Sequence, residues 1–183
     1  MRNFFLMLAC FFACCSNIQA QKYFTKTGQI SFYSDTPIEK IEALNKSSNC
    51  VMDVETGKIE FAVLVKGFQF DKALMQEHFN ENYMESNKYP KATFKGQIDG
   101  YQKLDISKNG KSNVHATGDL TIHGVTKKVT TSGVLVVVNG KIDIDATFDV
   151  ILADYKISIP ALVRDQISKT VKIKVDVTLE PLK

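Results

Sequence analysis

A strict alternation of apolar and polar residues constrains this chain more than any other feature. In residues 141–152, KIDIDATFDVIL, every second residue from Ile142 to Leu152 is apolar, and those between are mostly Asp or Thr. Successive side chains of a β-strand point to opposite faces, so this period predicts a strand with one buried and one solvated face. The same pattern, complete or partial, occupies 29–34, 50–54, 58–70, 91–99 and 171–180.

Glycine-containing turns separate several of these strands. The tetrapeptides ETGK (55–58), KNGK (108–111) and VNGK (138–141) have the Gly or Asn-Gly chemistry of tight hairpins. In 58–70 the alternation changes phase at Gly67, where we expect a bulge or a bend. Long strands joined by short turns predict an antiparallel meander with one apolar face.

One segment has a helical period instead. Residues 70–84, FDKALMQEHFNENYM, predict a helix of about three turns that links two strands, with Asp71 as its N-cap. We expect His78 to be a half-buried packing residue, because it falls on the apolar side of this helix. That side carries Leu74, Met75, His78 and Phe79.

The meander must hide its apolar face, either by closing into a barrel or by stacking as two sheets. A chain of 183 residues is long enough for one domain with a single core. The long hairpins and the single helix favour an all-β fold, an up-and-down antiparallel barrel of about eight strands. The interior of such a barrel either is filled by side chains or holds one small ligand.

The first twenty residues differ in composition from the rest. MRNFFLMLACFFACCSNIQA has one basic residue, Arg2, an apolar run over 4–15 and a small residue, Ala20, at its end. This pattern predicts a secretory signal peptide at 1–20, followed by a secreted domain at 21–183. Every later apolar run is broken by polar residues within a few positions, so we expect no transmembrane segment in the mature chain.

Three of the four cysteines, Cys10, Cys14 and Cys15, lie within the predicted signal peptide. Lipoprotein anchoring at Cys14 or Cys15 is the alternative to simple cleavage, although the residues before them fit a lipidation box poorly. Only Cys50 remains after cleavage, so no intramolecular disulfide is expected. We expect Cys50 to be a small hydrophobe half-buried in a strand. A reactive thiol, or one that links a homodimer, is the alternative.

Charge and motifs exclude several function classes. The formal net charge is +3, from 23 basic and 20 acidic residues that are scattered along the chain, so we expect no nucleic-acid partner. The sequence contains no P-loop, G-x-G-x-x-G, H-E-x-x-H or G-x-S-x-G motif. Asp143, Asp145 and Asp149 lie on one polar strand face without the loop of a calcium site. We therefore expect no metal, no cofactor and no enzyme activity.

Two of the three histidines occur in VHATGDLTIHGVTKKVT, residues 114–130. His115, Asp119 and His123 would share one face of a strand, but the two histidines would then lie ~27 Å apart. A metal ion needs its ligand atoms ~2 Å from its centre, so this trio is not expected to bind one or to act as a catalytic pair. We interpret this face as solvated. The opposite face is apolar and mostly small, with Val114, Ala116, Gly118, Leu120 and Ile122.

Two sequence blocks identify a family resemblance. KYPKATFKGQI (88–98) followed by ATGDLTIHGVTKKV (116–129) resembles the paired motifs of the YceI-like family, and the similarity extends over 23–181. The resemblance implies a lipocalin-like, extended eight-stranded antiparallel barrel with a long apolar tunnel. It also implies a periplasmic or secreted protein whose tunnel binds a polyisoprenoid or a similar amphiphile.

One segment departs from the family pattern. Many members have a helical segment rich in Arg and Asp before the Tyr-Pro motif, whereas residues 71–86, DKALMQEHFNENYMES, are more apolar and contain no arginine. If this segment borders the mouth of the tunnel, the head group or the chain type of the ligand can differ. The resemblance therefore does not transfer the identity of the ligand.

The expected function is binding of a hydrophobic small molecule, such as an isoprenoid or fatty amphiphile, in an apolar tunnel. Burial of apolar surface contributes ~25 cal/mol per Å² before the costs of binding. Candidate contacts are aromatic or branched residues on the predicted inner faces, although each can equally be ordinary core. These candidates are Phe32, Phe61, Val63, Phe94, Leu120, Ile122, Phe148 and Val150.

Two other classes of function stay open from the sequence. A filled barrel would act as a secreted interaction module, with Lys127 and Lys128 or the row of aspartates at 143–149 meeting a partner. An enzyme, such as a lipid hydrolase or isomerase, would need a nucleophile beside a base, and no such arrangement is recognisable. The volume of the interior separates the first two classes, because a cavity above ~300 Å³ favours a ligand.

Overall fold

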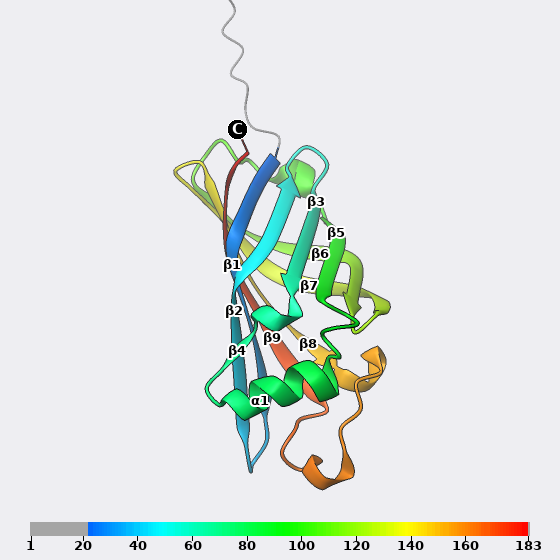
Figure 1. Cartoon of the computed structure of the whole chain (residues 1–183). Helices are drawn as coiled ribbons and strands as arrows, with labels where there is room; N and C mark the ends of the chain where they lie inside the picture. Colours follow the sequence, from blue (N-terminus) through cyan, green and yellow to red (C-terminus); the bar gives the residue numbers. More distant parts are fainter. Residues whose placement is uncertain (1–21, 183) are drawn as a thin grey trace, which may run out of the picture.

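The computed structural model describes residues 22–182. Eight strands follow one another around a closed antiparallel sheet, because β1 pairs with both β2 and β9 (Figure 1). The predicted eight-stranded up-and-down barrel is therefore confirmed, while the predicted signal peptide and the lipidation alternative lie outside the described residues. The barrel strands are β1 (Lys22–Asp35), β2 (Lys40–Asp53), β3 (Lys58–Leu64), β5 (Lys91–Ile98), β6 (Gly110–Ile122), β7 (Val125–Val138), β8 (Lys141–Ile151) and β9 (Thr170–Pro181).

Two of the hairpins are closed by two-residue turns. Asn139 and Gly140 have φ of 50° and 76°, and His123 and Gly124 have φ of 49° and 72°. Positive φ at both central positions is the turn geometry that matches the right-handed twist of the flanking strands. The hairpin predicted at VNGK is thus confirmed, and His123 is a turn residue at the end of β6.

The other two predicted turns have different outcomes. At ETGK the chain turns between β2 and β3, with Gly57 at φ 67° and Asp53 accepting hydrogen bonds from the N–H groups of Glu55 and Thr56. These bonds lower the pKa of Asp53. The hairpin predicted at KNGK is wrong. Gly110 begins β6, and residues 99–109, with the 3-10 turn η3 (Tyr101–Lys103), form a longer connection from β5.

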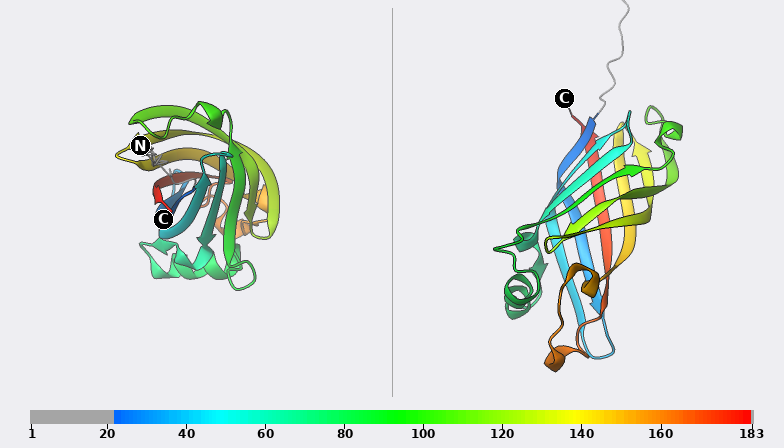
Figure 2. Two further views of the ribbon diagram at one scale, coloured as in Figure 1. Left: turned by 90° about the horizontal axis from the view of Figure 1, so that it is seen from above. Right: turned by 90° about the vertical axis from the view of Figure 1, so that its right-hand side faces the viewer.

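The segment between β3 and β5 leaves the barrel wall and lies against one side of the barrel near its lower end (Figures 1 and 2). The phase change at Gly67 is a 3-10 turn, η1 (Val65–Gly67), after which the short strand β4 (Gln69–Phe70) pairs with β2. The predicted helix is present as α1 (Ala73–His78) continued by a π-helical turn, η2 (Phe79–Tyr83).

Details of the helix prediction were wrong. The N-cap is Lys72 rather than Asp71, and no side chain caps the helix. Leu74 is 61% exposed instead of sharing the apolar side, and His78 is exposed rather than half-buried. A helix this short needs tertiary contacts, such as that of Phe79 with Phe32 of β1, because isolated short helices are marginal in water.

The two ends of the barrel differ in packing. Where the β2–β3 and β7–β8 turns lie, the interior is filled by side chains that are at most 1% exposed, among them Met52, Leu135, Ile142 and Leu179. The opposite end is bordered by α1, by η4 (Leu152–Tyr155) and by the segment that contains η5 (Ala161–Val163) (Figure 1). We call this opposite end the mouth. The interior is therefore blind at one end and approachable at the other.

Strands β5 and β6 approach closely because two glycines face each other. Gly96 and Gly118 are direct partners in the ladder. A Cβ on Gly118 would collide with Gly96 Cα and with the carbonyl oxygen of Lys95, which belong to backbone and cannot move aside cheaply. A Cβ on Gly96 would meet the ring of Phe94, so the glycine pair also gives that ring its place on the inner face.

We predict that Gly118→Ala destabilises the barrel by about 1–3 kcal/mol, because the added methyl group overpacks a backbone contact. Gly110→Ala is the matched control, since the nearest atom to its added Cβ is 4.0 Å away. Urea unfolding monitored by circular dichroism measures both variants. Equal midpoints for Gly118→Ala and the wild type would contradict the close contact.

Candidate ligand-binding cavity

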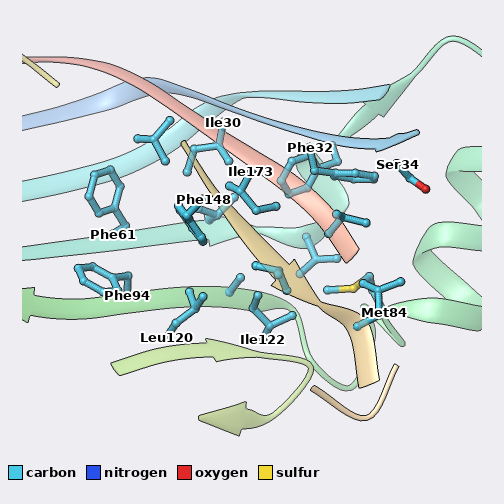
Figure 3. A pocket seen from close by; sticks show the side chains of 18 of the residues that line it. Ile30, Phe32, Ser34, Phe61, Met84, Phe94, Leu120, Ile122, Phe148 and Ile173 are labelled. Carbon is cyan, nitrogen blue, oxygen red and sulfur yellow. The ribbon is translucent and has the colours of Figure 1, made fainter. Parts of the chain in front are cut away.

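The barrel encloses an apolar cavity of about 340 Å³ that reaches from its middle to the mouth. Each of the eight barrel strands contributes inward-facing side chains to its wall, and these are nearly all hydrocarbon. Figure 3 shows the rings of Phe32, Phe61, Phe94 and Phe148 around this space. The wall contains small residues beside the large ones, including Ala92, Ala116, Gly133 and Ala146. These small side chains leave the middle of the barrel hollow, whereas the blind end is packed.

The structure places every predicted contact residue on the wall of this cavity. They come from five strands, β1, β3, β5, β6 and β8. The four phenylalanines among them are only half-buried although they lie inside the barrel, because they face the hollow. Their contact with a ligand stays a prediction. The wall positions predicted from sequence are Phe32, Phe61, Val63, Phe94, Leu120, Ile122, Phe148 and Val150.

The mouth is built by residues that strand periodicity did not reveal. Met75 and His78 of α1, Phe79 and Tyr83 of η2, and Met84 directly after η2 border the cavity. Burial raises the pKa of the Tyr83 hydroxyl. The only sequence signal for this side was the helical period of 70–84. On the other side, Val163, Gln166 and Ile167 come from a segment without any period.

Aromatic contacts hold the helical segment at the side of the mouth. Phe79 stacks on Phe32 with ring centroids 5.3 Å apart, and it also contacts Phe70 at 5.0 Å and Phe68 at 5.8 Å. Such pairs contribute ~0.5–1.5 kcal/mol each beyond the area they bury. Phe32 therefore has two roles, as wall of the cavity and as an anchor for η2.

Polar contacts fix the rest of the mouth. Ser34 is 2% exposed, and its hydroxyl oxygen accepts a hydrogen bond of 2.9 Å from the N–H of Ser168. The Lys72 ammonium lies 3.0 Å from the Glu39 carboxylate, which joins the start of α1 to the β1–β2 loop. Three chain segments that are remote in sequence are thereby tied around one opening.

The histidine face predicted to be solvated is only partly so. His115 is exposed and lies 3.0 Å from the Ser132 hydroxyl, and Asp119 lies 3.7 Å from Lys128. The side chain of His123, in contrast, is only 11% exposed, because the positive φ of its turn removes it from the strand alternation. The solvated interpretation was wrong for His123. Within residues 22–182 there is no group of three side chains that could hold a metal ion.

His123 joins three elements behind the mouth. Its Nε2 lies 2.8 Å from the Glu85 carboxylate and its Nδ1 lies 3.1 Å from the backbone carbonyl oxygen of Tyr155. Both partners are acceptors, so both contacts are hydrogen bonds when each ring nitrogen carries a proton. The ring also packs edge-on against Tyr89, with centroids 4.6 Å apart. His123 thus links the β6–β7 turn, the end of the helical segment and η4.

Cys50 is fully buried on β2, where it is paired with Phe61 of β3. Burial raises the pKa of the Cys50 thiol, which favours its neutral form in the folded protein. It is more deeply buried than the half-buried strand residue that the sequence suggested. A homodimer linked through this thiol is incompatible with that position, while a homodimer through another surface stays a prediction.

Fold and cavity define the class, a closed up-and-down barrel with an apolar interior open at one end. Residues 20–179 match the family model of the YceI-like domain, and the chain belongs to this family. None of the helices within residues 22–182 has the length and apolar character needed to cross a membrane. A comparison with curated proteins found no match.

Solved structures with this fold include a polyisoprenoid binding domain from Saccharophagus degradans implicated in plant cell wall breakdown. Its TM-score is 0.74 at 16% identity, over 89% of this chain and 99% of that one. BcnA of Burkholderia cenocepacia has a TM-score of 0.67 at 18% identity, over 83% and 95%. The YCEI protein of Campylobacter jejuni has a TM-score of 0.55 at 17% identity, over 73% and 81%. At these identities the similarity shows a shared fold.

We predict that His123→Asn destabilises the protein by about 1–3 kcal/mol, because Glu85 and the Tyr155 carbonyl lose their partner. Asparagine tolerates positive φ, so the turn itself is retained. Amide hydrogen exchange should accelerate around residues 79–89. The control His115→Asn removes an exposed histidine and should change stability by less than about 0.5 kcal/mol. Equal effects of the two variants would refute the link.

We predict that Cys50 of the folded protein resists maleimide labelling for hours and reacts within minutes in urea, because the thiol is buried and neutral. Val51→Cys is the matched control, since Val51 is the next residue on β2 and is 42% exposed. In this variant one added thiol should react at once in the folded state. Rapid native labelling of Cys50 itself would contradict its burial.

Proposed function

We propose that this protein is a secreted or periplasmic binding protein that takes the tail of a polyisoprenoid, or of another long-chain amphiphile, into its barrel. The observation that carries the proposal is the apolar cavity of about 340 Å³, open at the mouth. Membership of the YceI-like family and the fold shared with a polyisoprenoid binding domain support it.

The chemistry of the wall suits an unbranched or isoprenoid tail. Burial of each CH₂ group contributes ~0.8 kcal/mol, so a tail of about a dozen carbons gains about 10 kcal/mol before the costs of association. No polar anchor inside the barrel is needed for this gain. Polar side chains lie at the mouth instead, where His78, Tyr83 and Gln166 border the cavity and can meet a head group.

The alternative, a filled barrel that serves only as an interaction module, requires a packed interior. The cavity lies above the ~300 Å³ at which sites for small molecules begin, which favours the ligand. Binding rather than catalysis is proposed because the wall is hydrocarbon, and because His123, the most connected histidine, is engaged outside the cavity by Glu85.

Native mass spectrometry tests the proposal. We expect protein purified from its source to carry a stoichiometric amphiphile that organic extraction releases, and apo protein to take up an isoprenoid quinone or a long-chain fatty acid. Ala146→Phe should lose this uptake, because the added ring projects from the cavity wall into the hollow.

The control is Thr147→Phe, which adds the same ring at the next position of β8, on the exposed outer face. It should bind like the wild type. A wild-type protein that carries nothing and takes up nothing, or uptake unaffected by Ala146→Phe, would exclude the cavity as a binding site.

A further inference from the structure

The mouth ends in two protruding tips. One is the β1–β2 loop, residues 36–39, and the other is the segment around η5, residues 158–168. Figures 1 and 2 show these two loops as the outermost points of the described chain at the mouth. We call them the β1–β2 tip and the η5 tip.

Both tips present large apolar side chains to solvent. Leu162 of the η5 tip is 94% exposed, Ile38 of the β1–β2 tip is 65% exposed, and Leu74 on the adjoining helix α1 is 61% exposed. These are the three highest values among the exposed large hydrophobics of residues 22–182. A cluster of such side chains at one end of a molecule marks an interaction surface, whereas scattered ones are ordinary.

Hydrogen bonds hold the tips in place, so their apolar side chains are presented on formed turns. In the β1–β2 tip, the N–H of Thr36 donates to the Glu39 carbonyl at 3.0 Å, and the Thr36 hydroxyl oxygen accepts from the N–H of Glu39 at 3.0 Å. In the η5 tip, the N–H of Val163 donates to the Pro160 carbonyl at 3.2 Å. Backbone groups paired in this way enter an apolar phase at lower cost than free ones.

The two tips are continuous with the cavity. Glu39 of one tip, and Val163 and Ile167 of the other, also line its wall. Both tips therefore border the open end of the cavity. Within the two tips the charged side chains are Arg164, Asp165 and Glu39, so the tips carry no basic excess. Apolar insertion is therefore the main attraction and charge is secondary.

We propose that Ile38 and Leu162 insert into the interface of a lipid bilayer, so that the mouth faces the membrane and the amphiphile passes between bilayer and cavity without crossing water. The inference rests on the proposed function, since an amphiphile of that class resides in membranes. The residues that carry it are nevertheless on the outer surface, apart from the eight wall residues, so the two can be tested separately.

The sequence offers a direct test because it contains no tryptophan. Ile38→Trp and Leu162→Trp each introduce a single fluorophore at a tip, in a chain that starts at residue 21 and holds the whole barrel. Val138→Trp is the matched control, at a position 41% exposed beside the β7–β8 turn of the blind end. The probe is a vesicle of phosphatidylcholine with a fifth phosphatidylglycerol, and no added ligand.

With these vesicles, emission from both tip variants should shift to the blue and be quenched by brominated lipid, while the control should not change. The shift should persist at 0.5 M salt, since charge is secondary. An unchanged emission at both tips, or an equal change in the control, would overturn the membrane contact. Binding of the tips to a purified protein partner without any vesicle response would likewise overturn it.

Two further variants, a double substitution at the tips and Ala146→Phe in the cavity, test this inference separately from the proposed function. Ile38→Asp combined with Leu162→Asp should reduce vesicle co-sedimentation at least fivefold and leave uptake of an isoprenoid offered on cyclodextrin unchanged. Ala146→Phe should do the reverse. If the wild type binds vesicles but takes up no isoprenoid, the proposed function is contradicted and the membrane contact is not. If it takes up isoprenoid but binds no vesicles, the membrane contact is contradicted and the proposed function is not.

Discussion

The pairing of β1 with β9 is the contact on which the rest of the structure depends. It joins the first and last barrel strands, from Tyr23 with Pro181 to Tyr33 with Lys172, and so closes the sheet into a barrel. An open sheet of this length would expose unpaired N–H and C=O groups and one continuous apolar face to water. Closure places that face inside, and it also fixes the diameter at a value that side chains can either fill or leave hollow.

Residue size decides which of these two outcomes occurs along the barrel. At the blind end, large side chains such as Met52 and Leu179 belong to one core cluster and are fully buried. In the middle of the barrel, Ala116, Gly133 and Ala146 take inward positions, and their small size leaves the space that forms the cavity. Small residue size also matters at Gly96 and Gly118, the glycine pair of β5 and β6. Without side chains, these residues let the two strands approach closely and leave room for the Phe94 ring.

Much of this could be predicted from the sequence because a period of two is a local property. Alternation in the chain predicted the strands and their inner faces. The eight wall residues were predicted from these faces, in the segments 29–34, 58–70, 91–99, 114–130 and 141–152. The prediction of a hairpin at KNGK was wrong because Asn-Gly also occurs where a longer connection leads into a strand. The prediction that His123 is solvent-exposed was wrong, because its orientation depends on a positive φ and on Glu85, which lies 38 positions away in the sequence.

The mouth was beyond prediction for the same reason, since it depends on contacts between remote segments. Ser34 meets Ser168 across 134 positions, and Glu39 meets Lys72 across 33. Neither pair has any period that single-sequence reasoning could detect. The segment 158–168 contributes to the site only through this tertiary contact.

The blind end of the barrel has a consequence for which molecules can be accommodated. If a tail binds as proposed, a linear chain that enters at the mouth would stop against the packed layer around Met52 and Ile142. Chains shorter than the depth of the cavity would be wholly enclosed, and longer ones would leave their surplus length outside. Selection among homologous tails would then follow their number of carbons, and enlarging a single side chain of that layer would reduce the length that the cavity accepts.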